Sequence, residues 1–489
     1  MQNNSHNENI VLIGGGIMSL TLASLINEIL PKVKITLIEK LDDCGKESSD
    51  GLNNAGTGHA GYCELNYTPQ KNNNISIDHA VHINEMFEIS LQFWAYLDKK
   101  YPNFNVSSFL RKTPHISFVY GKKNVNFLKK RYDLLKKELL FKDMQFTNKI
   151  ETILQWAPLL IEKRKDNKYL AATKIDYGTD VNYGNLTRQL LTILKKSSNF
   201  SIHTNTEVKR ITKITKKNWA ITIQNKLSKK KQNIKSNKIF LGAGGQAISL
   251  LQQMNLDEAK GYAGFPISGK WLVCSNPKIV CKHNSKVYGQ ALPKAPPTSI
   301  PHLDLRVIDG KKTLMFGPFA GFTLKFLKHG SFFDFPKTIK LNNIRTMFVV
   351  LIKNINLLLY LIKQSLYFHK DRMRQLKNFF PAASEKDWTL LEAGQRVQIM
   401  KNCLQEGIKL QFGTEIIHTK DKTVSALIGA SPGASVAVDS MLNVVNEIFE
   451  NELQDKIQKI IPSYGIKLNE NPKKLKEIRT QIYSKLKLL

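Results

Sequence analysis

The stretch VLIGGGIMSLTLASLI, residues 11–26, sets the fold expected for this chain. A β-rich run ends in three glycines and continues as an apolar helical pattern, which Pro31 stops before a second β-rich run, KITLIEK. This order predicts a β-α-β unit that holds a dinucleotide. The first glycine permits a tight turn, the second lets the backbone approach a pyrophosphate, and the helix N-terminus attracts its charge. Gly14 and Gly16 take those places, and Ser19 replaces the third glycine, which governs only helix packing.

The residues after this unit favour FAD over NAD. Glu39 ends the second strand, where a carboxylate binds ribose hydroxyls and would repel the 2′-phosphate of NADP. Three more glycine-rich loops follow, at 53–61, 241–245 and 427–435, and glycine lets the backbone approach a planar ring. The predicted FAD contacts are Gly14, Gly16, Ser19, Glu39, Asn54, Gly56, Thr57, Gly58, His59, Val208, Gly242, Gly244, Gly429, Ser431, Gly433 and Ala434.

Length and composition limit the other classes of protein. The 489 residues are 42% hydrophobic, enough for more than one core. The net charge is +32, but the lysines are scattered and no aromatic-basic motif accompanies them, so nucleic-acid binding is not expected. The five cysteines form no C-x-x-C pair, and no metal site is expected. The N-terminus has no signal-peptide pattern and no uncharged apolar run reaches about 20 residues, which predicts a cytoplasmic protein that does not span a membrane.

The pattern of elements predicts an α/β fold, α+β overall. Asp309-Gly310 between two β-rich runs predicts a hairpin, and so antiparallel sheet, between glycine-rich segments. We expect a discontinuous Rossmann-like FAD-binding domain carrying an inserted substrate domain on a largely antiparallel sheet. The expected segments are 1–75, 176–262 and 391–450 for FAD, 76–175 and 263–390 for substrate, and 451–489 for a solvated, basic helical tail.

Residues 347–368, MFVVLIKNINLLLYLIKQSLYF, form the most apolar region of the chain. Lys353 and Lys363 interrupt it. The pattern favours a helix buried in the core. The alternative is a helix that lies on a membrane surface, because an apolar helix edged by lysines suits an anionic interface.

Several segments together resemble the bacterial malate:quinone oxidoreductase family. They are VLIGGGIMSLTLASL, ESSDGLNNAGTGHAGYCELNYTP, YGTDVNYGNLTRQL, PHLDLRVIDG, AGQRVQ and LIGASPGAS, in the family's order and spread to about residue 445. The resemblance implies an FAD-dependent enzyme of the citric acid cycle that oxidises (S)-malate to oxaloacetate and reduces a membrane quinone. It also implies peripheral association with the cytoplasmic face of the inner membrane. Leu305 departs from the pattern, where a smaller polar residue is expected.

Malate is a 2-hydroxy acid with two carboxylates. Its oxidation needs a base for the hydroxyl proton and cations for both carboxylates. In an extended PHLDLRVID, alternate residues share one face about 7 Å apart, which groups His302, Asp304 and Arg306 as base, orienting carboxylate and carboxylate clamp. Arg396 is the candidate for the second carboxylate, and His115 is an alternative base. The structural alternatives are a hairpin-capping His302 and ordinary ion pairs for the two arginines.

Two rival functions stay open at this point. One is an FAD-dependent dehydrogenase or oxidase of another 2-hydroxy acid or an amino acid. The other is a non-catalytic, basic binding protein that keeps a flavin fold. Cys44 is followed by Ser48 and Ser49 rather than a second cysteine, so electrons are expected to leave the flavin without a protein disulfide, as transfer to a quinone requires.

Overall fold

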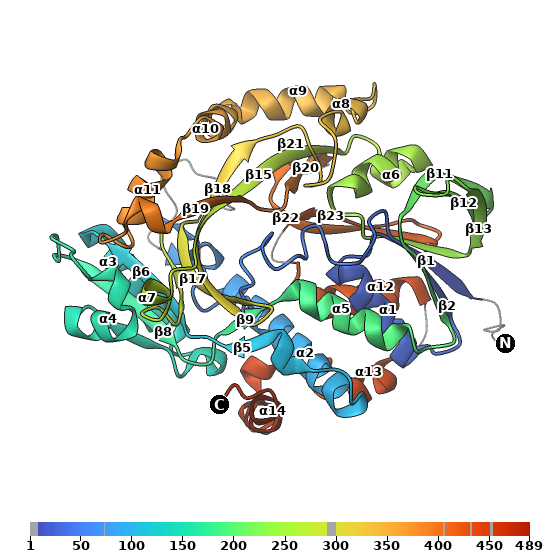
Figure 1. The fold of residues 1–489 in the computed structure, drawn as a ribbon. Helices are drawn as coiled ribbons and strands as arrows, with labels where there is room; N and C mark the ends of the chain where they lie inside the picture. Colours follow the sequence, from blue (N-terminus) through green and yellow to red (C-terminus); the bar gives the residue numbers. More distant parts are fainter. Residues whose placement is uncertain (1–7, 73, 291–299, 404–405, 431–432, 450–452) are drawn as a thin grey trace.

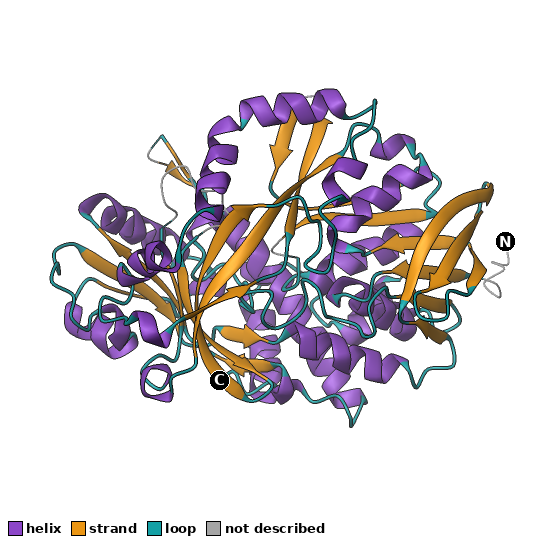
Figure 2. Ribbon diagram, turned by 45° about the horizontal axis from the view of Figure 1, so that its top comes forward, coloured by secondary structure: helices purple, strands orange, loops and turns teal. Residues whose placement is uncertain are grey.

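The computed structural model describes residues 8–72, 74–290, 300–403, 406–430, 433–449 and 453–489. Two large sheets organise it, one on each side of a central region of loops (Figures 1 and 2). The first sheet has the order β10-β2-β1-β14-β23-β22. Its strands are β1 (Asn9–Ile13), β2 (Lys34–Ile38), β10 (Phe200–His203), β14 (Lys238–Leu241), β22 (Gly413–His418) and β23 (Val424–Ala430).

The first five strands of this sheet are parallel, and β22 is antiparallel to β23. Helix α1 (Ile17–Ile29) leads from β1 to β2, which confirms the predicted β-α-β unit. Alternate residues of β1 enter different cores: Ile10 and Leu12 face one way, Val11 and Ile13 the other. Because both faces are covered, the strand reads as a continuous apolar run.

Helices cover one face of the parallel sheet and a small sheet covers the other (Figure 1). On the first face lie α1, α2 (Asp78–Lys100), α5 (Tyr183–Leu194) and α12 (Ala437–Phe449). On the second lie α6 (Ala247–Met254) and an antiparallel sheet of β11 (Thr206–Thr215), β12 (Asn218–Asn225) and β13 (Lys231–Ser236). This layered arrangement confirms the predicted α/β class.

The second large sheet has ten strands, in the order β21-β20-β15-β18-β17-β16-β6-β8-β7, with β19 also paired to β15. Its pairs are antiparallel except for β16 with β6. The strands are β6 (His115–Tyr120), β7 (Gln145–Thr147), β8 (Leu170–Ile175), β15 (Ala263–Cys274), β16 (Lys286–Tyr288), β17 (His302–Ile308), β18 (Lys311–Phe322), β19 (Thr389–Glu392), β20 (Arg396–Cys403) and β21 (Gly407–Gln411).

The predicted hairpin at Asp309-Gly310 is confirmed. It joins β17 to β18, and both turn residues have positive φ, 49° and 81°. Strands β20 and β21 fall inside 391–450, yet they pair in the ten-stranded sheet, because β20 lies along Ala263–Ile267 of β15. The boundary placed at 391 therefore does not coincide with the boundary between the sheets.

Smaller elements complete the fold. The helices α3 (Lys122–Leu135), α4 (Ile150–Trp156), α7 (Pro277–Val280) and α11 (His369–Lys377) surround the end of the ten-stranded sheet shown at the left of Figure 1. The helices α8 (Asp334–Lys337), α9 (Ile344–Lys353) and α10 (Ile355–Ser365) lie along its top. The two-stranded pairs are β3 (Gln70–Lys71) with β4 (Asn74–Ile75) and β5 (Leu110–Lys112) with β9 (Thr179–Val181).

The C-terminal segment is helical but it is not a solvated tail, so that expectation is wrong. Helices α13 (Gln454–Ile460) and α14 (Pro472–Lys485) pack near α2. Leu475 and Ile478, three residues apart, are buried, and Arg479 forms an ion pair of 2.8 Å with the buried Glu88. The lysines on the outer side of α14 account for its basic composition.

The prediction of one core helix at 347–368 is also wrong. The region forms α9 and α10, which meet at Asn354 and are bent by 78°. Only their inner faces are buried, and Phe348 and Leu359 are more than half exposed. Within the described ranges, no single helix has the length and apolar character to cross a bilayer, and α9 with α10 meets that criterion only as a bent pair.

Candidate active site

A cavity of about 1070 Å³ lies where the parallel strands end. The turn after β1, Glu39 after β2, and Gly242 after β14 all line it. Ligands of open α/β sheets bind at the carboxyl ends of the strands, where helix N-termini and turn N–H groups are exposed. The ten-stranded sheet closes the other side with residues such as His302 and Arg396.

The turn at Gly14 requires glycine. Its φ is +99°, and a Cβ there would lie 2.6 Å from the carbonyl oxygen of Gly242. Glu39 accepts hydrogen bonds from the N–H groups of Gly15 (2.5 Å) and Leu41 (2.7 Å), which holds its carboxylate beside the turn. Ser19 is fully buried beneath the two glycine turns, and its Oγ is 2.2 Å from the position that a Cβ of Gly242 would take. The predicted contact of Ser19 with FAD is therefore corrected to a packing role.

Most of the predicted FAD contacts meet in this one cavity. The predicted contacts that line it are Gly14, Gly16, Glu39, Asn54, Gly56, Thr57, His59, Val208, Gly242, Gly244, Gly429, Gly433 and Ala434. Gly58 lies behind the wall, since a Cβ there would be 1.9 Å from Oγ1 of Thr179. Ser431 lies outside the described residues. The glycine cradles, the acidic residue and the volume of the cavity fit FAD.

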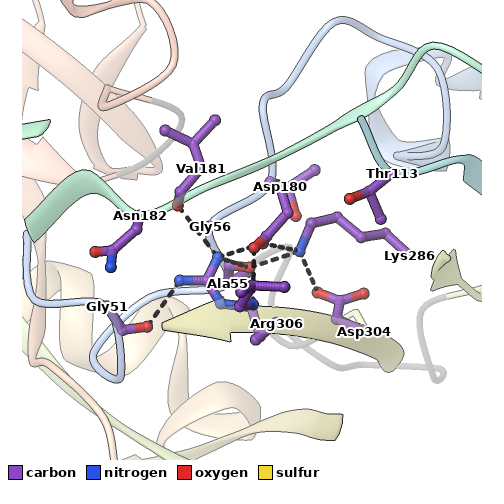
Figure 3. Close-up of polar contacts among 12 residues, drawn as sticks. Gly51, Ala55, Gly56, Thr113, Asp180, Val181, Asn182, Lys286, Asp304 and Arg306 are labelled. Carbon is purple, nitrogen blue, oxygen red and sulfur yellow. Dashed lines mark hydrogen bonds and ion pairs between the residues drawn. The ribbon is translucent and has the colours of Figure 1, made fainter. Parts of the chain in front are cut away.

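A buried group of alternating charges lies behind the loop at 51–57 (Figure 3). Nζ of Lys286 is 2.9 Å from Oδ1 of Asp180 and 3.5 Å from Oδ2 of Asp304. Arg306 also pairs with Asp180, at 2.7 Å. We call these four residues the ion cluster; two carboxylates balance two cations, and each side chain is 0% or 1% exposed.

Arg306 does not reach the cavity, so its predicted role as a substrate clamp is wrong. Its guanidinium donates to the carbonyl oxygens of Ala55 (2.8 Å) and Gly51 (2.9 Å) as well as to Asp180. A Cβ on Gly56 would lie 0.9 Å from Nη1 of Arg306. The arginine therefore holds the glycine loop against β9, and both terminal nitrogens of its guanidinium donate hydrogen bonds within the protein (Figure 3).

His302 lines the cavity at the start of β17. Its Nδ1 and Oδ2 of Asp304 are 2.8 Å apart, and its ring stacks on Tyr288 at 4.2 Å and 2°. Burial alone would raise the pKa of Asp304, but His302 and Lys286 outweigh it and bring that pKa to about 2. An ionised Asp304 therefore accepts from Nδ1–H, and Nε2 is left as the nitrogen that accepts a proton.

His115, the alternative base, is placed elsewhere. It is 1% exposed and does not line the cavity, and its Nε2 accepts a hydrogen bond of 3.0 Å from the N–H of Thr179. Burial lowers its pKa to about 4. We therefore correct His115 to a core histidine, which links the start of β6 to the start of β9 next to the ion cluster.

Arg396 begins β20 and lines the cavity. Burial lowers the pKa of its guanidinium, while Tyr288 and Glu64 act in the opposite direction. Glu64 lines the same cavity, and burial raises the pKa of its carboxyl to about 8 against the pull of Arg131 and Arg396. A cation and a largely neutral carboxyl therefore face the same space near neutral pH.

Sequence reasoning missed Glu64, Lys286 and Asp180. Glu64 and Asp180 lie inside two of the family-like segments, ESSDGLNNAGTGHAGYCELNYTP and YGTDVNYGNLTRQL, which was the one signal for them. Lys286 had no signal, since it is a single lysine in a three-residue strand. It meets Asp304 only because β16 and β17 pair in that register, which also sets Tyr288 opposite His302.

The fold and the cavity define an FAD-dependent oxidoreductase. The structure is similar to L-α-glycerophosphate oxidase from Mycoplasma pneumoniae with FAD bound, with a TM-score of 0.58, 16% identity, and coverage of 91% of this chain and 95% of that one. Residues 6–488 match the family model described as malate:quinone oxidoreductase. Probable malate:quinone oxidoreductases of Tolumonas auensis and Hahella chejuensis are 47% and 46% identical over 488 and 485 residues, each covering 98% of both chains.

The chain therefore belongs to the malate:quinone oxidoreductase family. This confirms the resemblance, the FAD cofactor and the class of reaction predicted from the sequence. The enzyme oxidises malate and transfers the electrons to a quinone.

Proposed function

We propose that His302 is the base that accepts the hydroxyl proton of (S)-malate and that Arg396 binds one of its carboxylates. The same proposal places the enzyme as a peripheral protein at the cytoplasmic face of the membrane that holds its quinone. The supporting observation is that His302, held by Asp304, lines the same cavity as the glycine cradles. In this proposal the parallel sheet carries FAD and the ten-stranded sheet carries the groups that bind malate.

The ion cluster keeps His302 in the right state for this role. The lowered pKa of Asp304, about 2, keeps its carboxyl ionised near neutral pH, so it fixes the Nδ1–H tautomer and stabilises the imidazolium that forms. Lys286 in turn stabilises the Asp304 carboxylate. Gly14, Gly16 and Glu39 line the cavity and would hold FAD, which would supply the hydride acceptor and the electron carrier to the quinone.

Arg396 suits a carboxylate because a guanidinium fork forms two parallel hydrogen bonds with it. Glu64 is compatible with a dianionic substrate, since the raised pKa keeps most of its carboxyl neutral at pH 7. A neutral carboxyl can donate a hydrogen bond, whereas an ionised one would repel malate. Oxidation to a ketone removes the hydroxyl proton that His302 accepts, so the base is needed in each turnover.

The test is the variant His302→Gln in the FAD-loaded enzyme. Loss of a general base lowers kcat by about 10²–10⁴-fold, and we expect that loss with flavin content unchanged. His369→Gln, in the first turn of α11, is the matched control and should keep full activity. Turnover is measured with malate and a water-soluble acceptor.

Flavin bleaching under anaerobic conditions identifies the substrate. Malate should bleach the wild-type flavin, while lactate, 2-hydroxyglutarate and amino acids should not. Activity of His302→Gln within a factor of about three of wild type would remove His302 as the base. Faster bleaching by another 2-hydroxy acid or an amino acid would replace malate as the substrate.

A further inference from the structure

One surface of the molecule exposes large hydrophobic side chains in unusual density. Of the 21 such side chains that are exposed among the described residues, 12 lie between residues 332 and 368. We call them the apolar face: Phe332, Phe333, Ile339, Leu341, Ile344, Phe348, Ile352, Ile355, Leu359, Ile362, Leu366 and Phe368. They lie on α9 and α10 and on the turns that flank α8, α9 and α10, at the outer edge of the fold (Figure 1). Exposed apolar patches of this kind mark interaction sites.

The helices are apolar on two opposite sides. On α9, Ile344, Phe348 and Ile352 recur every four residues and are exposed, whereas Met347 and Val350 are buried against the ten-stranded sheet. Leu361 of α10 is fully buried and Leu359 is 58% exposed. A helix that is hydrophobic all round is normally covered on every side. The ten-stranded sheet covers the inner side of these helices. The outer side would be covered only by another apolar surface.

The lengths of α9 and α10 suit helices that lie on a membrane surface better than helices that cross a bilayer. At about 1.5 Å per residue, α9 with 10 residues and α10 with 11 reach about 15 Å each. The hydrocarbon core of a bilayer is about 30 Å thick, and the 78° bend prevents the two helices from acting as one rod. Both can lie flat with their outer side chains in the interface.

The charge around the apolar face selects the kind of surface. From Phe332 to Lys370 the chain contains six cationic residues and one acidic residue, Asp334. The cations are Lys337, Lys340, Arg345, Lys353, Lys363 and Lys370, all exposed. Apolar side chains edged by cations match an anionic lipid surface, where the headgroups attract lysine and the acyl chains take the apolar groups.

The apolar face is continuous in sequence with the wall of the cavity. Leu327 lines the cavity, and the N–H of Lys328 donates to Oε2 of Glu47, which also lines it. Phe332, the first residue of the apolar face, follows five residues after Leu327. A bilayer under this face would therefore lie near the site that reduces a lipid-soluble quinone.

We propose that the apolar face and its lysines dock the enzyme onto an anionic lipid bilayer. The proposal rests on the peripheral location proposed above and names the surface responsible. The side chains of α9 and α10 enter the interface, and the lysines contact the headgroups.

The test is binding of the FAD-loaded enzyme to vesicles of phosphatidylglycerol and phosphatidylcholine. The variant Phe348→Gln/Ile352→Gln/Leu359→Gln should bind about 100-fold more weakly than wild type, because three apolar groups no longer leave water. The control is Leu154→Gln/Ile214→Gln/Leu227→Gln, which changes three exposed apolar residues outside the apolar face and should bind as wild type does. Lys353→Gln/Lys363→Gln should weaken binding to the anionic vesicles and lose its effect in high salt.

Turnover separates the possible outcomes. Malate oxidation with a water-soluble acceptor should be unchanged in the Phe348/Ile352/Leu359 variant, while reduction of a long-chain quinone in vesicles should fall with binding. Equal vesicle binding by this variant and wild type overturns the docking surface. A wild-type enzyme that oxidises malate but ignores vesicles overturns the peripheral location as well. Loss of a dimer in the variant, seen by sedimentation without a change in vesicle binding, would assign the face to a second copy and also overturn the proposal.

Discussion

Charged side chains usually lie at the surface of a protein and large apolar ones in its interior. The ion cluster buries charges, whereas the apolar face exposes large apolar side chains. The ion cluster holds four ionisable side chains that are 0% or 1% exposed, and the apolar face leaves side chains such as Phe348 and Leu366 64% and 71% exposed. The charges of the ion cluster are balanced within the chain, because each has an opposite partner and Arg306 also donates to backbone carbonyls. The side chains of the apolar face have no such partners within the part of the chain that the structure describes. The difference teaches that the ion cluster is stabilised by the protein's own residues, whereas we propose that a lipid surface covers the apolar face.

The largest effect should come from breaking the ion cluster. Arg306→Met would leave Asp180 with Lys286 as its cationic partner and would remove the arginine's hydrogen bonds to the carbonyls of Gly51 and Ala55. Removal of one partner from a buried pair costs about 3–5 kcal/mol, and we expect that loss in urea unfolding together with loss of FAD from the purified protein. Arg188→Met, which removes an exposed pair with Asp309, should cost at most about 1 kcal/mol. Equal midpoints for the two variants would contradict the bracing role of Arg306.

The next effect separates the two sides of α10. Leu361→Ala creates a cavity in the core and should cost about 2–5 kcal/mol, whereas Leu359→Ala, two residues away, should stay within about 0.5 kcal/mol. The measurement is urea unfolding without lipid. Because both variants remove the same atoms from the same helix, helix propensity cancels between them. A large loss in Leu359→Ala would mean that the apolar face is covered in solution.

The smallest effect concerns the pH dependence of stability. The folded pKa of Glu64, about 8, is raised above its ordinary 4.5, so the folded state holds the proton and stability is lost as the pH rises through that interval. Glu64→Gln removes this loss. Because Glu64 lines a cavity and solvent screens it, we expect the variant to gain about 2 kcal/mol relative to wild type between pH 5 and pH 8.5. Parallel pH profiles would show that the carboxyl is ionised at neutral pH.

Local sequence patterns predicted much of the fold. The β-α-β unit and the hairpin follow from local rules, since a strand, a glycine turn and an Asp-Gly pair each restrict the backbone within a few residues. The alternation in HLDLR is also local: His302, Asp304 and Arg306 point one way, and Leu303 and Leu305 enter a core on the other side. The error at Arg306 arose because alternation gives the face of a side chain and not what covers that face.

The sequence by itself determined the cofactor loops, the class of fold and the family, because these depend on residues close together or on motifs kept in order. Only the tertiary structure decided that Lys286 meets Asp304 across two strands, that His115 is a core residue, and that Arg306 holds a loop. It also decided which side of α9 and α10 is buried, since an apolar pattern on both sides of a helix cannot say which side the sheet will take. These outcomes depend on pairing and packing between segments far apart in the chain. Such contacts determine which side chains are buried and therefore how much free energy burial contributes.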